Sequence, residues 1–162
     1  MKLTSKQTIT SVFKSRWKLK LFFIRHLPMA FLAGLKVASF DEDHATVSLP
    51  YKYLTKNPFR SIYFACQAMA AELSTAIICL QSLEKFDEDV SLLVTGLEAE
   101  FTKKATGVIS FICELEESLD PIFEECLSQD KSQTVTLVSN GVDENSESVA
   151  KFKITWSFKP RS

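Results

Sequence analysis

The sequence predicts an α+β fold in which one antiparallel sheet wraps around a single long, buried helix. Three features predict this arrangement. Residues 59–83 form an apolar stretch whose many alanines would make a thin helix. Six shorter segments have the character of strands, and the clearest alternation of apolar and polar residues lies at 150–158. The connections between neighbouring strands are short, which favours antiparallel pairing.

The N-terminal segment, residues 4–26, is expected to form an additional helix. Val12, Trp17 and Ile24 recur near one face, and basic residues lie between them. Pro28 ends this helix or starts a short turn. We therefore divide the chain into an N-terminal helical extension, residues 1–28, and a main domain, residues 29–162. The helix has two interpretations: a packing helix with a solvated basic face, or an arm that contacts a membrane surface or attracts anions.

The six predicted strands and a second short helix complete the main domain. The strands are expected at residues 34–40, 45–49, 90–101, 107–115, 134–140 and 150–158, and an acidic helix is expected at 116–129. In the strand at 90–101 the alternation changes phase at Gly96, which predicts a bulge. Beyond it Leu97, Ala99 and Phe101 alternate with two glutamates. A curled sheet still has edges, and a dimer that extends the sheet would cover one of them.

Composition and charge restrict the class of protein. The chain has 162 residues, 46% of them hydrophobic and 24% charged, as expected for one folded soluble domain. A net charge of −1 argues against a general nucleic-acid binder, which would usually be basic. The charge is uneven, because the first forty residues carry eight Lys or Arg and no acid.

Neither a metal site nor a membrane span is expected. The four cysteines form no CxxC pair, and two histidines give no ligand cluster beside them. Reduced, mostly buried thiols are typical of a cytoplasmic protein. Residues 19–26 lack the clean apolar core of a secretory signal. The stretch at 59–83 is long enough to span a bilayer, but Arg60, Gln67 and Glu72 favour a helix buried inside a soluble protein.

Glu72 is the most informative residue, because it is a lone acid in the middle of this apolar helix. Desolvating a carboxylate is costly unless something pairs with it. One explanation is structural, with a backbone amide, Asn57 or Tyr63 as the partner. The other is chemical, because acids with perturbed pKa values cluster at active sites, although not only there. Asn57 lies fifteen positions earlier, in the loop before the helix.

From Met29 to Pro160 the predicted arrangement resembles the hotdog fold of the thioesterase and dehydratase superfamily. The most specific part is residues 57–76. Many hotdog thioesterases place an Asn or Gln in the loop before the long helix and an Asp or Glu fifteen positions later, and Asn57 and Glu72 match both positions. Residues 57–72 also resemble a branch of the superfamily usually described only as thioesterase-like.

The resemblance implies an acyl thioesterase that acts on coenzyme A or carrier-protein thioesters at a site between two subunits of a homodimer or tetramer. Glu72 would be the base or nucleophile, and Asn57 would orient the water or the thioester. The backbone amides of Phe64 and Ala65 would be the oxyanion donors at the helix start. No cofactor is implied, apart from coenzyme A as part of the substrate.

Candidate ligand-binding residues surround the helix start: Arg60, Ser61, Tyr63, Lys103 and Lys104. The two lysines follow the long strand, where hotdog proteins often hold the phosphates of coenzyme A, although a solvated basic turn is the alternative. Active relatives often carry His-Gly-Gly or similar small residues at the helix start, whereas the bulk of Tyr63 and Phe64 would fill the room that a thioester needs.

A second function therefore stays open: a non-catalytic hotdog module that binds an acyl chain or another hydrophobic small molecule at the dimer interface. The dehydratase branch is not expected, because it needs a catalytic histidine near the helix start. His26 and His44 are the histidines of this chain, and neither is in that position.

Overall fold

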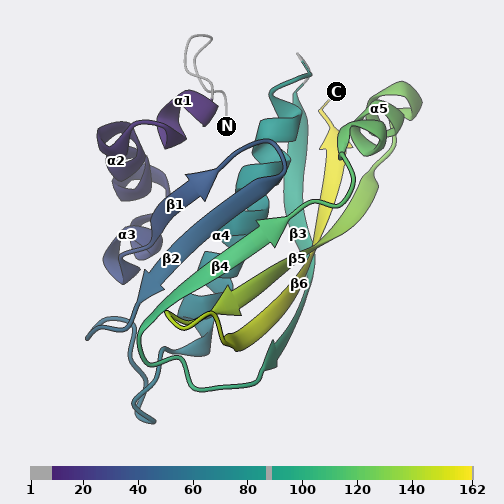
Figure 1. Cartoon of the computed structure of the whole chain (residues 1–162). Helices are drawn as coiled ribbons and strands as arrows, with labels where there is room; N and C mark the ends of the chain where they lie inside the picture. The colour runs from purple at the N-terminus through teal and green to yellow at the C-terminus, as the bar shows by residue number, and fades with distance from the viewer. Residues whose placement is uncertain (1–8, 87–88, 162) are drawn as a thin grey trace.

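One antiparallel sheet organises the computed structural model, which describes residues 9–86 and 89–161. In this part of the chain six strands pair in the order β1-β2-β4-β5-β6-β3. The strands are β1 (Lys36–Phe40), β2 (His44–Pro50), β3 (Val90–Phe101), β4 (Val108–Glu114), β5 (Gln133–Val142) and β6 (Ser148–Pro160). Figure 1 shows the sheet curving across the long helix α4 (Phe64–Leu83). The predicted six-stranded sheet around one long helix is therefore confirmed.

The core lies between α4 and the inner face of the sheet. In β2 every second residue is fully buried, namely Ala45, Val47 and Leu49. The same alternation runs along β6 through Phe152, Ile154 and Phe158. Small residues of α4 let its backbone approach these strands closely. The helix is long and apolar enough to cross a bilayer, but most of it is buried inside the protein, as expected for a core helix.

Two buried hydroxyl groups fix α4 against the sheet. The Ser74 and Ser139 hydroxyls share a hydrogen bond of 2.8 Å. Trp156 Nε1 on β6 donates to Thr75 Oγ1 at 3.0 Å, and Thr75 Oγ1 donates to the Glu72 carbonyl oxygen at 2.9 Å. These bonds set the rotation and height of α4 at the turn that carries Glu72.

The N-terminal segment differs from the single helix predicted at 4–26. Its first five residues lie outside the described part, and the rest forms α1 (Ile9–Phe13) and α2 (Arg16–His26). The break falls at Ser15, whose backbone is extended. Pro28 then starts α3 (Pro28–Ala33), consistent with the preference of proline for the first helical turn. The division of the chain at residue 28 stays a prediction.

Two predicted element starts are wrong, each because of backbone geometry. Gly34 does not open a strand: it caps α3 in the left-handed conformation, with φ of 77°, and β1 begins at Lys36. The central helix begins at Phe64 rather than at residue 59, because residues 57–61 close a tight loop in which Arg60 has φ of 58°.

The predicted bulge of β3 is confirmed, since the register with β6 shifts between Val94 and Gly96. The apolar residues beyond the bulge remain accessible: Leu97 and Phe101 are each 48% exposed. The reason is topological, because β3 is an edge strand that pairs only with β6. The acidic helix is also confirmed, as α5 (Asp120–Gln129), and begins four residues later than expected.

Candidate functional site

The loop before α4 is built by the side chain of Asn57. Its Oδ1 accepts hydrogen bonds from the backbone N–H groups of Phe59, at 2.9 Å, and Ser61, at 3.2 Å. Its Nδ2 donates to Ser61 Oγ at 3.0 Å. Asparagine is suited to this role because its side chain imitates a backbone turn. Asn57 therefore shapes the loop that leads into the helix, and Ser61 is held beside it.

The start of α4 presents two free backbone donors. Tyr63 is the N-cap, and its carbonyl oxygen accepts from the N–H of Cys66 at 2.9 Å. The N–H groups of Phe64 and Ala65 donate to no acceptor within the described residues. The start of a helix carries about half a positive charge. These two amides are therefore free to donate to an acceptor outside the described chain, and their role as oxyanion donors stays a prediction.

A hollow of about 610 Å³ opens at this end of α4, and we call it the helix-start hollow. Its walls come from the loop and start of α4 and from residues 101–105, which comprise the last residue of β3 and the loop after it. Tyr63 and Phe64 lie at its rim, about half exposed and packed edge to face at 4.8 Å. Their bulk was expected to fill the site, yet this volume is within the range of small-molecule sites.

Gln67 adds a polar group that no sequence pattern singles out. It lines the helix-start hollow and is 5% exposed. Its Nε2 donates to the Ile62 carbonyl oxygen at 3.2 Å, whereas its Oε1 has no partner within the described residues. A buried acceptor without a partner costs free energy, so this oxygen favours a donor placed in the hollow.

The three predicted cations differ in availability. Lys103 forms ion pairs with Asp143, at 2.7 Å, and Glu147, and these hydrogen bonds raise the pKa of Lys103. Lys104 also lines the hollow and makes one long contact, 3.5 Å from its Nζ to the Phe59 carbonyl oxygen. Arg60 is exposed but is not part of the wall. Lys104 is therefore the cation best placed to meet an anionic ligand here.

Glu72 lines a second, smaller hollow of about 240 Å³, which we call the Glu72 hollow. Desolvation by burial raises the pKa of this carboxyl group. The carboxylate has no hydrogen bond or ion pair with any described residue, so neither Asn57 nor Tyr63 is its partner. A structural explanation of Glu72 requires a partner that stabilises the buried carboxylate, and the partners considered for it do not contact the carboxylate.

The walls of the Glu72 hollow come from the helix itself and from the corner between α2 and α3. Met69 and Leu73 lie on α4, and residues 26–30 form the opposite side. No sequence pattern indicates that His26 lies here, because 46 positions separate it from Glu72. Only the packing of α3 against α4 brings the corner over the acid.

Within one chain the acid and the oxyanion donors lie apart. Phe64 and Glu72 are separated by eight residues of the same helix, which is about 12 Å along its axis. They also line different hollows. A glutamate side chain is too short to bridge this distance, so one chain does not bring Glu72 to a carbonyl bound at its own helix start.

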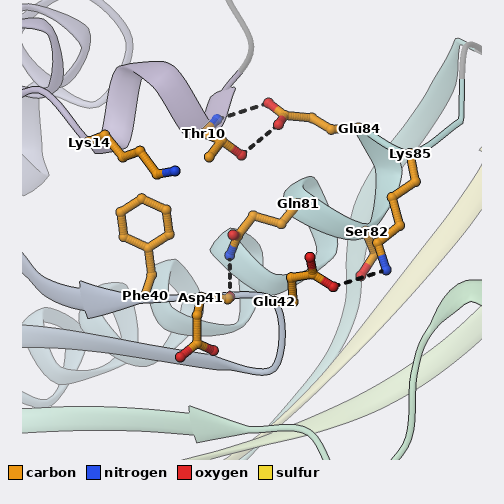
Figure 2. Close-up of a pocket in the computed structure, with 9 residues that line it drawn as sticks. All are labelled: Thr10, Lys14, Phe40, Asp41, Glu42, Gln81, Ser82, Glu84 and Lys85. Atoms are coloured by element: carbon orange, nitrogen blue, oxygen red, sulfur yellow. Dashed lines mark hydrogen bonds and ion pairs between the residues drawn. The ribbon is translucent and has the colours of Figure 1, made fainter.

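A third hollow, of about 380 Å³, lies at the other end of α4 and contains none of the predicted site residues. Figure 2 shows Glu84 accepting hydrogen bonds from the backbone and side chain of Thr10, and Gln81 bonded to the Asp41 backbone. These bonds fasten α1 and the β1–β2 turn to the end of α4. In the described part of the chain, no three His, Cys, Asp or Glu residues form a group suited to a metal ion.

The fold is the hotdog fold, as solved structures of similar shape show. A Chlorobaculum tepidum protein of unknown function superposes with a TM-score of 0.80 at 20% identity, over 98% of this chain and 100% of that chain. A Pseudomonas aeruginosa protein described as a "Probable Thioesterase" has a TM-score of 0.74 at 16% identity, over 91% and 97% of the two chains.

A Staphylococcus aureus thioesterase is a third structural relative, with a TM-score of 0.66 at 12% identity over 82% of this chain and 99% of that chain. It has been solved as two variants, one with a glutamine and one with a glutamate replaced by alanine, at positions fifteen residues apart.

The family follows from the sequence. The family model described as a domain of unknown function, DUF4442, matches residues 15–158, and the chain belongs to this family. A comparison with curated proteins finds no match.

Proposed function

We propose that this protein hydrolyses an acyl thioester of coenzyme A or of a carrier protein. The observation that carries the proposal is a desolvated, unpaired carboxylate on the same helix whose start presents two free amides. General acid–base or nucleophilic chemistry needs the first feature, and stabilisation of an oxyanion needs the second. The structural likeness to proteins named as thioesterases supports the same reaction class.

The reaction assigns one task to each group. The amides of Phe64 and Ala65 hold the thioester oxygen and stabilise its charge when the carbonyl carbon becomes tetrahedral. Glu72, acting as the base, takes a proton from water while the water oxygen bonds to that carbon. The carbon–sulfur bond then breaks, the thiolate receives the proton, and a carboxylic acid is released. Acting as the nucleophile, Glu72 would attack the carbonyl carbon, break the carbon–sulfur bond and release the thiolate, which is protonated by solvent. Water then cleaves the resulting anhydride into a carboxylic acid and free Glu72.

The distance along α4 requires two chains for this chemistry. Because about 12 Å separates the amides from the acid of the same helix, we propose that each site combines the helix start of one protomer with Glu72 of its partner. Two surfaces favour a homodimer. The edge strand β3 exposes Leu93, Leu97 and Phe101, and α4 carries a partly accessible stripe formed by Ala65, Ala68 and Glu72. A tetramer made of two such dimers is compatible with this arrangement.

The spacing in the Staphylococcus aureus thioesterase supports the choice of residues. Its two altered positions, an amide side chain and a glutamate, are fifteen apart, and Asn57 and Glu72 have the same separation. We propose that Asn57 acts in this chain by fixing the loop before the amides rather than by touching the substrate. All four hydrogen-bonding contacts of its side chain stay within residues 57–61.

The substrate assignment uses the helix-start hollow. Lys104 and the positive end of α4 would attract the phosphates of coenzyme A or of a carrier-protein arm.

The four cysteines are free and buried thiols, which favours a reducing compartment such as the cytoplasm.

Hydrolysis of a panel of acyl-CoA thioesters, from acetyl to palmitoyl, tests the proposal. We expect Glu72→Gln to lower kcat by roughly 10²- to 10⁴-fold while the fold stays intact by circular dichroism. Glu124→Gln, which removes an exposed acid from α5, is the matched control and should keep full activity. Equal activity in wild type and Glu72→Gln, or turnover of no thioester by the wild type, would contradict the proposal.

A second function is favoured by the aromatic walls of the helix-start hollow. Phe59, Phe64 and Phe101 line it, and such walls suit an acyl chain or another hydrophobic ligand that is held without turnover. Under this alternative a lipid-like molecule would co-purify with the protein and would be identified by mass spectrometry after denaturation. The acyl-CoA panel would then give no hydrolysis.

A further inference from the structure

Helix α2 has two apolar faces, and only one of them is covered. Leu19, Phe22 and Phe23 lie together on the inner face, and Phe23 is buried. At about 100° per residue, Trp17, Leu21 and Ile24 lie within roughly 60° of one another on the opposite face. Trp17 is 82% exposed and Leu21 is 65% exposed. No packing within the described chain explains this outer face.

Basic residues flank the outer face on both sides. Lys20 and Arg16 lie on one side of it around the helix, and Lys18 and Arg25 lie on the other. All four side chains are exposed, and none of them forms an ion pair with another described residue. Residues 1–40 contain no acid at all. An apolar ridge of this kind offers apolar side chains to the acyl region of a bilayer, and the cations beside it can meet lipid phosphates.

Helix α3 extends this surface. Met29 is 62% exposed and Leu32 is 47% exposed, whereas Ala30 and Ala33 face inward and are buried. The two helices are joined at a single residue, Leu27, and Lys20 lies over the Phe31 ring at 6.0 Å. In Figure 1, α2 and α3 lie together on the side of the molecule next to β1.

We propose that α2 and α3 form a docking surface for an anionic lipid bilayer. The docking surface consists of Trp17, Leu21, Ile24, Met29 and Leu32 with the cations of α2. The apolar side chains would enter the boundary between headgroups and acyl chains, and the cations would meet the lipid phosphates. A second copy of the chain is the poorer occupant, because pairing two such surfaces would place unpaired cations against cations.

The Glu72 hollow lies next to the docking surface. Residues 26–30, which form the corner between α2 and α3, line that hollow, while Met29 belongs to both the hollow and the docking surface. Docking would thus bring the wall of the Glu72 hollow that contains Met29 close to the bilayer. The proposal about docking stands whether or not the chain hydrolyses thioesters, because it depends only on the outer surface.

Flotation of the full-length protein with lipid vesicles tests the inference. The protein is expected to bind vesicles that contain about one third phosphatidylserine. Binding to vesicles of pure phosphatidylcholine should be much weaker, and a higher salt concentration should reduce binding to the anionic vesicles. The variant Lys18→Gln/Arg25→Gln should bind roughly 25-fold more weakly, about fivefold for each charge. The variant Trp17→Ser/Leu21→Ser should lose at least roughly tenfold.

Matched control variants remove side chains of the same kinds from other parts of the protein surface. Tyr53→Ser deletes another exposed aromatic side chain, and Lys131→Gln/Lys159→Gln deletes two exposed charges; both should bind like wild type. Circular dichroism checks that each variant is folded. Failure of the wild type to float, or equal flotation of all variants, would overturn the proposal. So would a change from dimer to monomer in Trp17→Ser/Leu21→Ser without vesicle binding, because a second copy would then be the occupant.

Discussion

The hydrogen bond from Trp156 to Thr75 should control how firmly the Glu72 turn of α4 is held on the sheet. Thr75 is fully buried, and its Oγ1 accepts from Trp156 Nε1 at 3.0 Å. Thr75→Val keeps the shape of the side chain but removes the acceptor. The indole N–H then loses its partner in a site where Trp156 is 5% exposed.

The expected cost is about 1–3 kcal/mol of unfolding free energy, the penalty for a buried donor without a partner. For a chain of this size that corresponds to a fall in Tm of roughly 2–12 °C. Urea unfolding followed by far-UV circular dichroism gives the free energy, because this signal does not depend on the tryptophan that the double-mutant cycle removes. All variants are compared at one protein concentration, because a dimer gains stability as concentration rises.

A double-mutant cycle isolates this bond from other effects of the substitution. In a Trp156→Phe background no indole N–H is left unpaired, so Thr75→Val should cost less than about 0.5 kcal/mol. Thr136→Val, which removes an exposed hydroxyl bonded to Thr155, is the surface control and should be nearly neutral. The reasoning is refuted if Thr75→Val costs the same in both backgrounds, or if it is as mild as the surface control.

Two further predictions concern the acid and the edge of the sheet. Burial raises the pKa of Glu72, so the native state holds this proton more tightly than the unfolded chain, and stability is lost as pH rises through the raised pKa. Glu72→Gln should therefore be more stable than wild type at pH 7 and equal to it below about pH 4. Urea unfolding at each pH measures the two free energies of unfolding. A gain in stability that does not depend on pH would contradict this prediction. Leu97→Glu should convert the proposed dimer to a monomer in analytical ultracentrifugation, because it places a charge on the exposed edge of β3. Leu54→Glu, in an exposed loop, is the control, and a Leu97→Glu protein that stays dimeric would remove β3 from the interface.

The parts of the fold that follow from local periodicity could be predicted from the sequence. The alternation of apolar and polar residues in β6 and the long apolar sequence of α4 each reflect burial against the core. The phase change at Gly96 reflects a bulge, which the register with β6 confirms. The break at Ser15 and the cap at Gly34 were not predicted, because they depend on how α1 and α3 pack against α4 and against α2 between them.

The candidate site likewise contains some residues that local sequence spacing predicts and others that it does not. The pair Asn57 and Glu72 is recognisable from spacing, because both lie on one continuous segment. The place of His26 beside Glu72 depends on tertiary packing of distant segments. The ion pairs of Lys103 with Asp143 and Glu147 depend on the β5–β6 turn lying against the loop after β3. No pattern within residues 101–105 carries that information.

Complementation between two inactive variants tests most directly whether the site is shared by two chains. Glu72→Gln removes the acid, and Phe64→Pro removes one oxyanion amide. Proline is tolerated at the first helical residue, and Tyr63 before it is already extended, with ψ of 134°. Each variant alone should be folded, dimeric and inactive toward the acyl-CoA that the wild type hydrolyses best.

The decisive measurement is the activity of an equimolar mixture of these two variants, unfolded and refolded together. If each site takes Glu72 from one protomer and the amides of Phe64 and Ala65 from the other, half of the dimers are mixed and each mixed dimer contains one intact site. The mixture should then regain about one quarter of wild-type activity. A mixture that contains mixed dimers by mass spectrometry and yet stays inactive would contradict a shared site.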